Sequence, residues 1–328
     1  MKAKKLVAFV AAALFVFAGA LCFPAAAENY PEEPIRFIIP NNPGGAIETI
    51  VRKFQPYVEA ELGVPLRIEN MGGGGGIIGT TVVSKSRADG YTISAKSIGS
   101  LVNSWVLQGA DYTVDDFEYL ARFTNDPGVV MVRKDAPYNN LTEFVAWVKT
   151  RPANSVTMSL ANITDINFLG LRSIEDAAGI DLNIVGFNGG GAARIAVVSG
   201  EVTGTHCNYF GASAVWDDCK VLAVHQNKNT IPSLAGIQTV NEGLGAATEE
   251  ISTNFVLHAP KGFSEKHPDR AKKLMDAFHA AWKNPDFQKM LKDSGQDGFI
   301  NVLDGAEAEA EIRAYDKFIT ANKDQFAN

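Results

Sequence analysis

Short apolar runs alternate with turn residues and amphipathic segments along the first third of the chain. Residues 34–40 (PIRFIIP) are rich in β-forming residues, and a turn cluster follows them. From Ala46 to Leu62 the apolar residues recur with the period of a helix, so we predict a helix there that Gly63 ends. Residues 64–70 and 91–95 predict the next two strands, with a small-residue helix at 79–86 between them. This alternation of strand, turn and helix is typical of a parallel sheet covered by helices.

A second series of the same kind begins near residues 128–132. It ends in a strand-like segment at 252–259, which a run of amphipathic segments follows. The predicted elements of this part are strands at 156–160, 183–187 and 220–224 and helices at 140–150, 168–178, 191–199, 264–283, 285–294 and 306–323.

Two series of this kind predict an α/β fold of two lobes, each a sheet flanked by helices. We expect the chain to cross between the lobes near 124–128 and again near 249–254, which makes a hinge. The first lobe would comprise 28–126 and 252–300 and the second 127–251, while the pattern assigns the C-terminal helix, 301–328, to neither.

The N-terminal segment has the pattern of a secretory signal. Lysines at positions 2, 4 and 5 precede an apolar run of 16 residues at 6–21, and Ala25-Ala26-Ala27 offers a cleavage site. An uncleaved anchor would need about 20 apolar residues to span a bilayer. Lipid attachment at Cys22 is the alternative, but the bulky Leu21 precedes it. We expect residues 1–27 to be removed and the mature protein to be exported to the periplasm.

Composition limits the function classes. The 328 residues are 46% hydrophobic and 20% charged, which is ordinary for a globular protein and excludes a disordered chain. The net charge of −7 becomes −10 when residues 1–27 leave with their three lysines. An acidic chain is a poor nucleic-acid binder, because phosphate contacts need clustered basic residues.

Two cysteines, Cys207 and Cys219, remain in the mature chain. In an oxidising compartment a pair 12 positions apart can form a disulfide, and we predict that bond. The alternative is two buried thiols.

Three glycine-rich loops follow predicted strands and open predicted helices. They are residues 41–46 (NNPGGA), 71–79 (MGGGGGIIG) and 187–192 (FNGGGA). Unpaired N–H groups at a helix N-terminus favour an anion, and glycine lets a ligand approach the backbone closely. We therefore predict one site for a small carboxylate, lined from both lobes. The alternative is tight turns without a ligand.

Residues 74–79 also fit the dinucleotide pattern G-x-G-x-x-G, but the acidic residue expected about 20 positions later is missing. We expect no nucleotide and no other cofactor. The five histidines lack metal-ligand spacing, and there is no G-x-S-x-G elbow, so neither a metal site nor an enzyme is predicted. Lys96, at the end of a predicted strand, is interpreted as a solvated charge.

Several side chains near the loops could bind a ligand. Any single asparagine among them is as well explained as a cap or turn residue. Asp165 could accept a ligand amine, cap a helix or be a solvated acid. The candidate donors are Asn41, Asn42, Asn162, Thr164, Asn188 and Asn208.

The chain resembles a known family, the periplasmic substrate-binding proteins of tripartite tricarboxylate transporters, also called the Bug family. The resemblance runs from about Tyr30 to Phe318, and the order and spacing of its motifs carry it. These motifs are Tyr30-Pro31, Pro34-Ile35-Arg36, Pro43-Gly44-Gly45-Ala46, Glu69-Asn70 with the glycine tract and Ile78-Gly79, Ala88-Asp89-Gly90-Tyr91-Thr92, Tyr112–Phe117, Ser199-Gly200-Glu201-Val202 and Ala259-Pro260-Lys261-Gly262.

The resemblance implies a type II-like clamshell that is not an enzyme. A small organic acid would bind between the lobes and be delivered to permease subunits in the membrane, with the protein working as a monomer. A sensor of the same fold that docks on a receptor kinase is the alternative. The implied ligand-binding residues are Asn41, Asn42, Gly44, Gly45, Ala46, Gly74, Gly75, Gly76, Ile77, Ser97, Asn162, Thr164, Asp165, Phe187, Asn188, Gly189 and Asn208.

The sequence departs from the family pattern at the loops. Asn41-Asn42 stands where an aromatic is usual, and Asn188 stands where a lysine is usual. Together with Asp165, these changes disfavour a highly charged tricarboxylate and favour a hydroxylated or amine-bearing acid. Because no basic residue lies in the loops, we expect backbone N–H groups to hold the carboxylate. Valine at Gly45 or Gly76 should then weaken binding in a folded protein.

Overall fold

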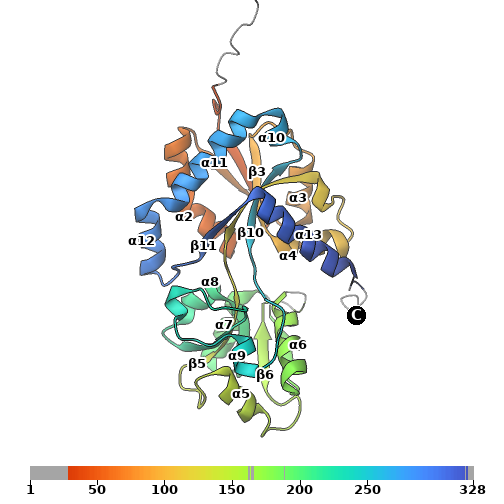
Figure 1. Ribbon diagram of the computed structural model, residues 1–328, viewed down its shortest axis with the longest axis vertical. Coiled ribbons are helices and arrows are strands. Elements are labelled where there is room, and N and C mark those ends of the chain that lie inside the picture. The colour runs from red at the N-terminus through yellow and green to blue at the C-terminus, as the bar shows by residue number, and fades with distance from the viewer. Residues whose placement is uncertain (1–28, 162, 164–165, 188, 322, 324–328) are drawn as a thin grey trace, which may run out of the picture.

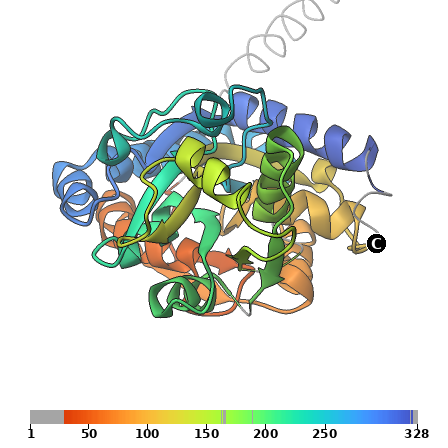
Figure 2. The same ribbon diagram turned by 90° about the horizontal axis from the view of Figure 1, so that it is seen from below.

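The computed structural model describes residues 29–161, 163, 166–187, 189–321 and 323. It contains two sheets flanked by helices, stacked along the long axis of the molecule (Figure 1). We call the part built on the six-stranded sheet the first lobe and the part built on the five-stranded sheet the second lobe. In the view from below, the second lobe overlies the first (Figure 2). The predicted signal, residues 1–27, lies outside the described residues.

The first lobe has the strand order β11-β4-β10-β3-β1-β2. β1 pairs in parallel with β2 and β3, and β10 then pairs antiparallel with both β3 and β4. Its strands are β1 (Ile35–Ile39), β2 (Leu66–Asn70), β3 (Thr92–Ser97), β4 (Phe117–Thr124), β10 (Phe255–Pro260) and β11 (Ile300–Asp304).

Helices bury apolar side chains on both faces of this sheet. On one face, Phe54 of α2 (Ala46–Leu62) packs edge-on against Phe278 and Trp282 of α11 (Pro268–Lys283). The helices with side chains in the cluster on the other face are α3 (Ile77–Ser84), α4 (Ile98–Val106) and α13 (Gly305–Ala321). The remaining elements of the lobe are η1 (Gly74–Gly76), η2 (Val114–Asp116), α10 (Phe263–Lys266) and α12 (Pro285–Asp293).

The second lobe has the strand order β7-β6-β8-β5-β9. β6 is parallel to β7 and β8, while β5 is antiparallel to its neighbours β8 and β9. Its elements are β5 (Gly128–Arg133), α5 (Leu141–Val148), β6 (Thr157–Leu160), α6 (Ile166–Ala178), β7 (Asn183–Gly186), α7 (Gly190–Ser199), β8 (Gly204–Asn208), α8 (Tyr209–Ala212), η3 (Ser213–Val215), β9 (Cys219–Val224), η4 (Pro232–Leu234) and α9 (Val240–Leu244).

Two chain segments run between the lobes (Figure 1). They are bonded to each other, since Thr253 N donates to Asp126 O at 2.9 Å and Gly128 N donates to Ile251 O at 2.7 Å. Glu311 of α13 accepts a hydrogen bond from Asn254 Nδ2 at 2.8 Å and pairs with Arg122 of β4 at 3.2 Å. The C-terminal helix therefore packs on the first lobe and braces the crossing segments.

A second contact joins the lobes beside these segments. The Tyr209 hydroxyl at the start of α8 donates to Gly295 O at 2.8 Å, and the rings of Phe210 and Phe299 lie 4.4 Å apart. The apolar core of the first lobe continues through this contact into the second.

The predicted disulfide is wrong. Cys207 and Cys219 are both buried and are not joined to each other. Cys207 lies opposite Val129 and Cys219 opposite Arg133, on the two strands that flank β5. Because two strand spacings separate the two residues, their Cα atoms lie at least about 10 Å apart. A disulfide can bridge Cα atoms only up to roughly 7 Å apart.

Some elements differ from the predicted ones. The pattern did not predict β4, α4 or β11. The helix expected at 264–283 is two helices, because Pro268 disfavours a helical conformation at His267 before it. Among the described residues no helix is long and apolar enough to cross a membrane.

Candidate ligand-binding site

The glycine tract forms a left-handed turn at the start of α3. Gly73, Gly74, Gly75 and Gly76 all have positive φ, between 56° and 107°. At Gly76 a β-carbon would lie 2.4 Å from Pro40 O, so valine there would strain the fold. The expectation that this variant stays folded and loses only ligand affinity is therefore wrong. Gly45 is the better position, since its β-carbon would meet only Asn42 O, at 3.8 Å.

The two N-terminal loops contact each other. The Asn42 side chain lies against the backbone of Gly72, and Asn70 Nδ2 donates to Asn41 O at 3.3 Å. Glu48 of α2 accepts a hydrogen bond from Gly44 N at 2.7 Å and one from Arg52 Nε at 2.7 Å. The Gly44 hydrogen bond is the main cause that lowers the pKa of Glu48.

Several predicted backbone donors are already used within the loops. Besides Gly44, Gly76 N donates to Gly73 O at 3.0 Å, and the N–H of Ile77 donates to Gly74 O. Ser97 is the N-cap of α4, and its hydroxyl accepts a hydrogen bond from Ser100 N at 3.3 Å. These residues hold the shape of the loops in this structure.

Lys96 of β3 lies beneath the glycine tract and is fully buried. Its ammonium donates to Thr80 Oγ1 at 3.0 Å, to Tyr112 at 3.3 Å and to Ser104 Oγ at 3.5 Å. Desolvation lowers the pKa of Lys96 from 10.5 to about 7. The interpretation as a solvated strand-end charge is wrong, because β1 and β10 flank β3 and Lys96 lies in the pairing with β10.

The loops of the first lobe lie at the end that faces the second lobe. Ser97 at the end of β3 pairs with Phe255, and Ile98 N donates to Asn254 O in the crossing segment at 3.0 Å. Ser100 Oγ of α4 donates to Gly75 O at 3.3 Å, which ties the glycine tract to the same end.

In the second lobe the glycine loop opens α7. Phe187 N donates to Leu160 O at 2.9 Å and Gly189 N to Ala161 O at 3.0 Å, so β6 fixes the loop. Gly189 has a φ of 104° and caps α7. Of the other predicted residues in this lobe, Asn162, Thr164, Asp165 and Asn188 lie outside the described residues.

The sequence reasoning missed Arg194. This half-buried side chain of α7 reaches back over Gly190 and lies against Gly211, where β-carbons would meet its Nη1 at 2.9 and 2.6 Å. None of the ion pairs within the described part of the chain includes it. The sequence feature that could have identified Arg194 is its position four residues after Gly190, because this spacing places both residues on one face of a helix.

Asn208 at the end of β8 belongs to a buried chain of hydrogen bonds. Its Nδ2 donates to Asp126 O in a crossing segment at 3.0 Å, and its Oδ1 accepts from Asn167 Nδ2 at 3.0 Å. Asn167 Oδ1 then lies 2.7 Å from His206 Nδ1, and His206 Nε2 lies 3.0 Å from His225 Nδ1. Since Asn167 accepts there, His206 Nδ1 carries the hydrogen and Nε2 accepts from His225.

The two histidines are buried and neutral. Desolvation lowers the pKa of His206 well below its usual value and that of His225 to about 4. The His206 ring lies against Gly128, where a β-carbon would be 2.4 Å from His206 Cε1. Within the described residues no group of three His, Cys, Asp or Glu side chains could hold a metal ion.

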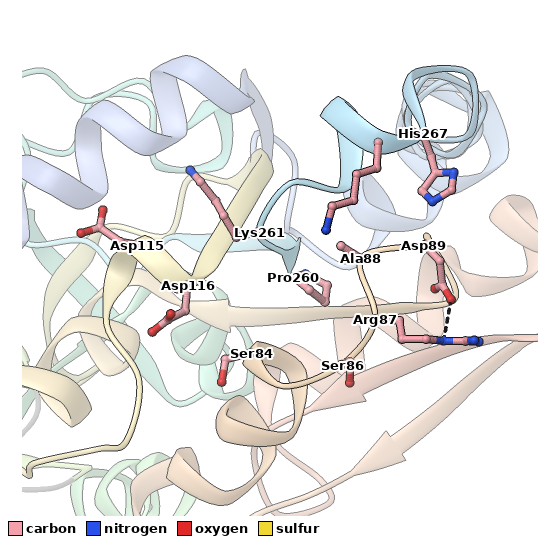
Figure 3. Close-up of a pocket in the computed structure, with 11 residues that line it drawn as sticks. Ser84, Ser86, Arg87, Ala88, Asp89, Asp115, Asp116, Pro260, Lys261 and His267 are labelled. Carbon is pink, nitrogen blue, oxygen red and sulfur yellow. Dashed lines mark ion pairs between the residues drawn. The ribbon is translucent and has the colours of Figure 1, made fainter.

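A separate depression lies at the other end of the first lobe (Figure 3). It measures about 600 Å³ and is lined by basic and acidic side chains, among them Lys261, Lys266 and Asp116. Pro260, at the end of β10 opposite to Phe255, also lines it, so it is remote from the glycine loops. It contains none of the predicted site residues.

Similarity to known proteins covers most of the chain. Residues 50–307 match the family model described as "Tripartite tricarboxylate transporter family receptor". A UPF0065 protein of Bordetella pertussis is 29% identical over 275 residues, which are 83% of this chain and 83% of that protein. A solved structure of a periplasmic transporter is 26% identical with a TM-score of 0.74, over 89% of this chain and 96% of that chain. An R. palustris protein solved with adipate shares the fold, at 19% identity and a TM-score of 0.72, over 91% of this chain and 97% of that chain.

Proposed function

Because the chain belongs to the tripartite tricarboxylate transporter receptor family, we propose that it captures a small organic carboxylate between its lobes in the periplasm. It then delivers this ligand to the permease subunits of a transporter. Adipate in a structural neighbour supports the carboxylate class.

The glycine tract above Lys96 is the observation that carries this proposal. Four consecutive glycines with positive φ form a backbone turn at the N-terminus of α3, where the helix dipole favours an anion. The buried Lys96 amine behind the turn adds positive potential when it is protonated, without occupying the loop.

The second lobe contributes a positive group from α7. The guanidinium of Arg194 can form two parallel hydrogen bonds to a carboxylate, as planar guanidinium groups do. A ligand with one acidic group at the glycine tract and another polar or acidic group at Arg194 would bridge the lobes. We therefore favour a short dicarboxylate, including a hydroxylated one, over a monocarboxylate.

Closure of the lobes on the ligand is part of the proposal. The two bonded crossing segments form a hinge, and hinge closure is a common response to ligand in such folds. Small-angle scattering with and without adipate should show a smaller radius for the liganded protein. An unchanged radius with adipate proven to bind would count against closure.

The binding test is a thermal-shift screen of mono-, di- and tricarboxylates on the purified mature protein. A ligand present at 100 times its Kd adds about 2.7 kcal/mol of stability. For a ligand so found, Gly45→Val and Arg194→Met should each weaken binding at least about tenfold, which is about 1.4 kcal/mol. Lys261→Met, an exposed charge removed from the opposite end of the same lobe, should bind like the wild type. No shift with any carboxylate would overturn the proposal.

A further inference from the structure

Lys96 is a buried basic side chain whose hydrogen-bond partners among the described residues are all neutral. Its three hydrogen-bond partners are the hydroxyl groups of Thr80, Ser104 and Tyr112. Burial is the cause of its lowered pKa, with no contribution from a carboxylate. A buried ammonium without a counter-charge is costly, and such groups either lose their proton or acquire an anion.

The groups that face Lys96 from each neighbouring element are few. From α3 and α4 come the hydroxyls of Thr80 and Ser104, and from the segment before η2 comes Tyr112. From β10 comes His258, which is fully buried. Burial above all, with a smaller contribution from Lys96, lowers its pKa to about 4. Burial raises the pKa of Tyr112, so the phenol is neutral too. None of these groups is an anion near neutral pH.

The ammonium lies directly behind the glycine tract. A β-carbon on Gly76 would be 3.1 Å from Lys96 Nζ. The Thr80 hydroxyl accepts from Lys96 and donates to Gly76 O at 2.8 Å. The Ser104 hydroxyl lies 3.5 Å from Lys96 Nζ and 3.5 Å from Gly75 O. The amine of Lys96 therefore lies directly against the backbone of the turn.

We propose that the bound carboxylate is the missing counter-charge of Lys96, and that capture is coupled to uptake of one proton by this lysine. The proton passes from solvent to the neutral amine, and no covalent bond to the ligand forms. Lys96 is a positioning residue for charge, since the backbone of the turn stands between it and the ligand. This inference rests on the proposed function and assigns a determinant of affinity within that site.

The direction of the coupling follows from electrostatics. An anion within several ångströms favours the charged form of a lysine, so binding raises its pKa. By linkage, affinity is greatest at pH values where Lys96 is already protonated and falls as pH rises above about 7. The limiting slope is about tenfold in Kd per pH unit for one coupled proton.

The test uses calorimetric titration of the mature protein with acetate, malate and adipate, at about pH 6 to 9 and in two buffers of different ionisation enthalpy. We expect that near pH 8 about one proton is taken up per carboxylate bound, and that Kd rises at least about fivefold across the range. Lys96→Met should bind more weakly at low pH, take up no proton and show a flat Kd. Lys96→Arg, which stays charged, should bind with a flat Kd at every pH. Lys261→Met is the matched control and should retain the wild-type pH dependence.

Two different failures can be separated. If a carboxylate binds with equal heats in both buffers, or if Lys96→Met keeps the wild-type pH dependence, the coupling is wrong while carboxylate capture stands. If none of the three carboxylates stabilises the wild type or gives a binding heat at any pH, the proposed function fails and the coupling with it. The Lys96→Met titration also subtracts the ligand's own protonation.

Discussion

The two lobes bury basic side chains near their facing ends, but they satisfy them in different ways. In the second lobe His206 and His225 are neutral and bonded to each other, and His206 is also bonded to Asn167. In the first lobe Lys96 has only hydroxyl partners. An imidazole can donate and accept at once, so it completes a buried chain without charge, whereas an ammonium can only donate. The comparison teaches that the buried histidines of the second lobe are satisfied within the protein, whereas the buried lysine of the first lobe has no counter-charge among its hydrogen-bond partners.

The largest expected effect is on the stability of Lys96→Met. The folded pKa of Lys96 is about 7 against an ordinary 10.5, so the folded state binds fewer protons between these values. Wild-type stability should therefore rise with pH from about 7 towards 10, and the buried charge should cost roughly 5 kcal/mol below pH 7. Lys96→Met should be more stable than the wild type at about pH 6, with a gap that narrows at about pH 9. Urea denaturation at the two pH values measures this, and a less stable variant at pH 6 would contradict it.

The opposite sign is expected for His206→Leu. It removes the middle member of a hydrogen-bond chain, so that Asn167 Oδ1 and His225 Nδ1 each lose their hydrogen bond to His206. We expect a loss of about 2–4 kcal/mol, from unsatisfied buried polar groups. The same denaturation experiment measures it. If both Lys96→Met and His206→Leu stabilised the protein, the distinction between the lobes would be lost.

A pH series sharpens the comparison within the second lobe. The pKa of His225 falls to about 4 on folding. Because the unfolded state then binds a proton that the folded state does not, the free energy of unfolding decreases as pH drops below 6.5. Between about pH 7 and pH 5, His225→Gln should lose about 2 kcal/mol less stability than the wild type. Parallel denaturation curves for the two proteins across this range give the difference. A constant difference would show that folding does not lower the pKa of His225.

The smallest effect is expected from reductant. Because β5 separates Cys207 from Cys219, the second lobe owes its rigidity to packing and hydrogen bonds rather than to a cross-link. Dithiothreitol should leave the melting temperature unchanged, whereas a lost disulfide in a loop of this size would cost about 3 kcal/mol. Alkylation after unfolding without reductant should modify both thiols, as intact mass would show. A mass that lacks both modifications would show that Cys207 and Cys219 do form a disulfide.

The sequence predicted most of the first-lobe strands and the loops between them. β1, β2 and β3 follow from short apolar runs bounded by turn residues, and α2 follows from its period. β4 was missed although it is almost fully buried, because its segment FEYLARFT mixes charged and apolar residues without alternation. Its Arg122 donates to Thr124 O within β4 and pairs with Glu311, which only the packing of α13 provides.

The sequence by itself determined the α/β alternation, the glycine turns before helices and the family resemblance, since all three depend on neighbours along the chain. The tertiary structure decided which residues meet. Lys96 is buried because β10, about 160 positions later, pairs beside β3. His206 of β8 meets His225, which directly follows β9, because both strands flank β5 and Gly128 leaves room for the His206 ring. Cys207 and Cys219, on the same two strands, stay apart. Strand order and register are long-range choices, and local sequence patterns do not encode them.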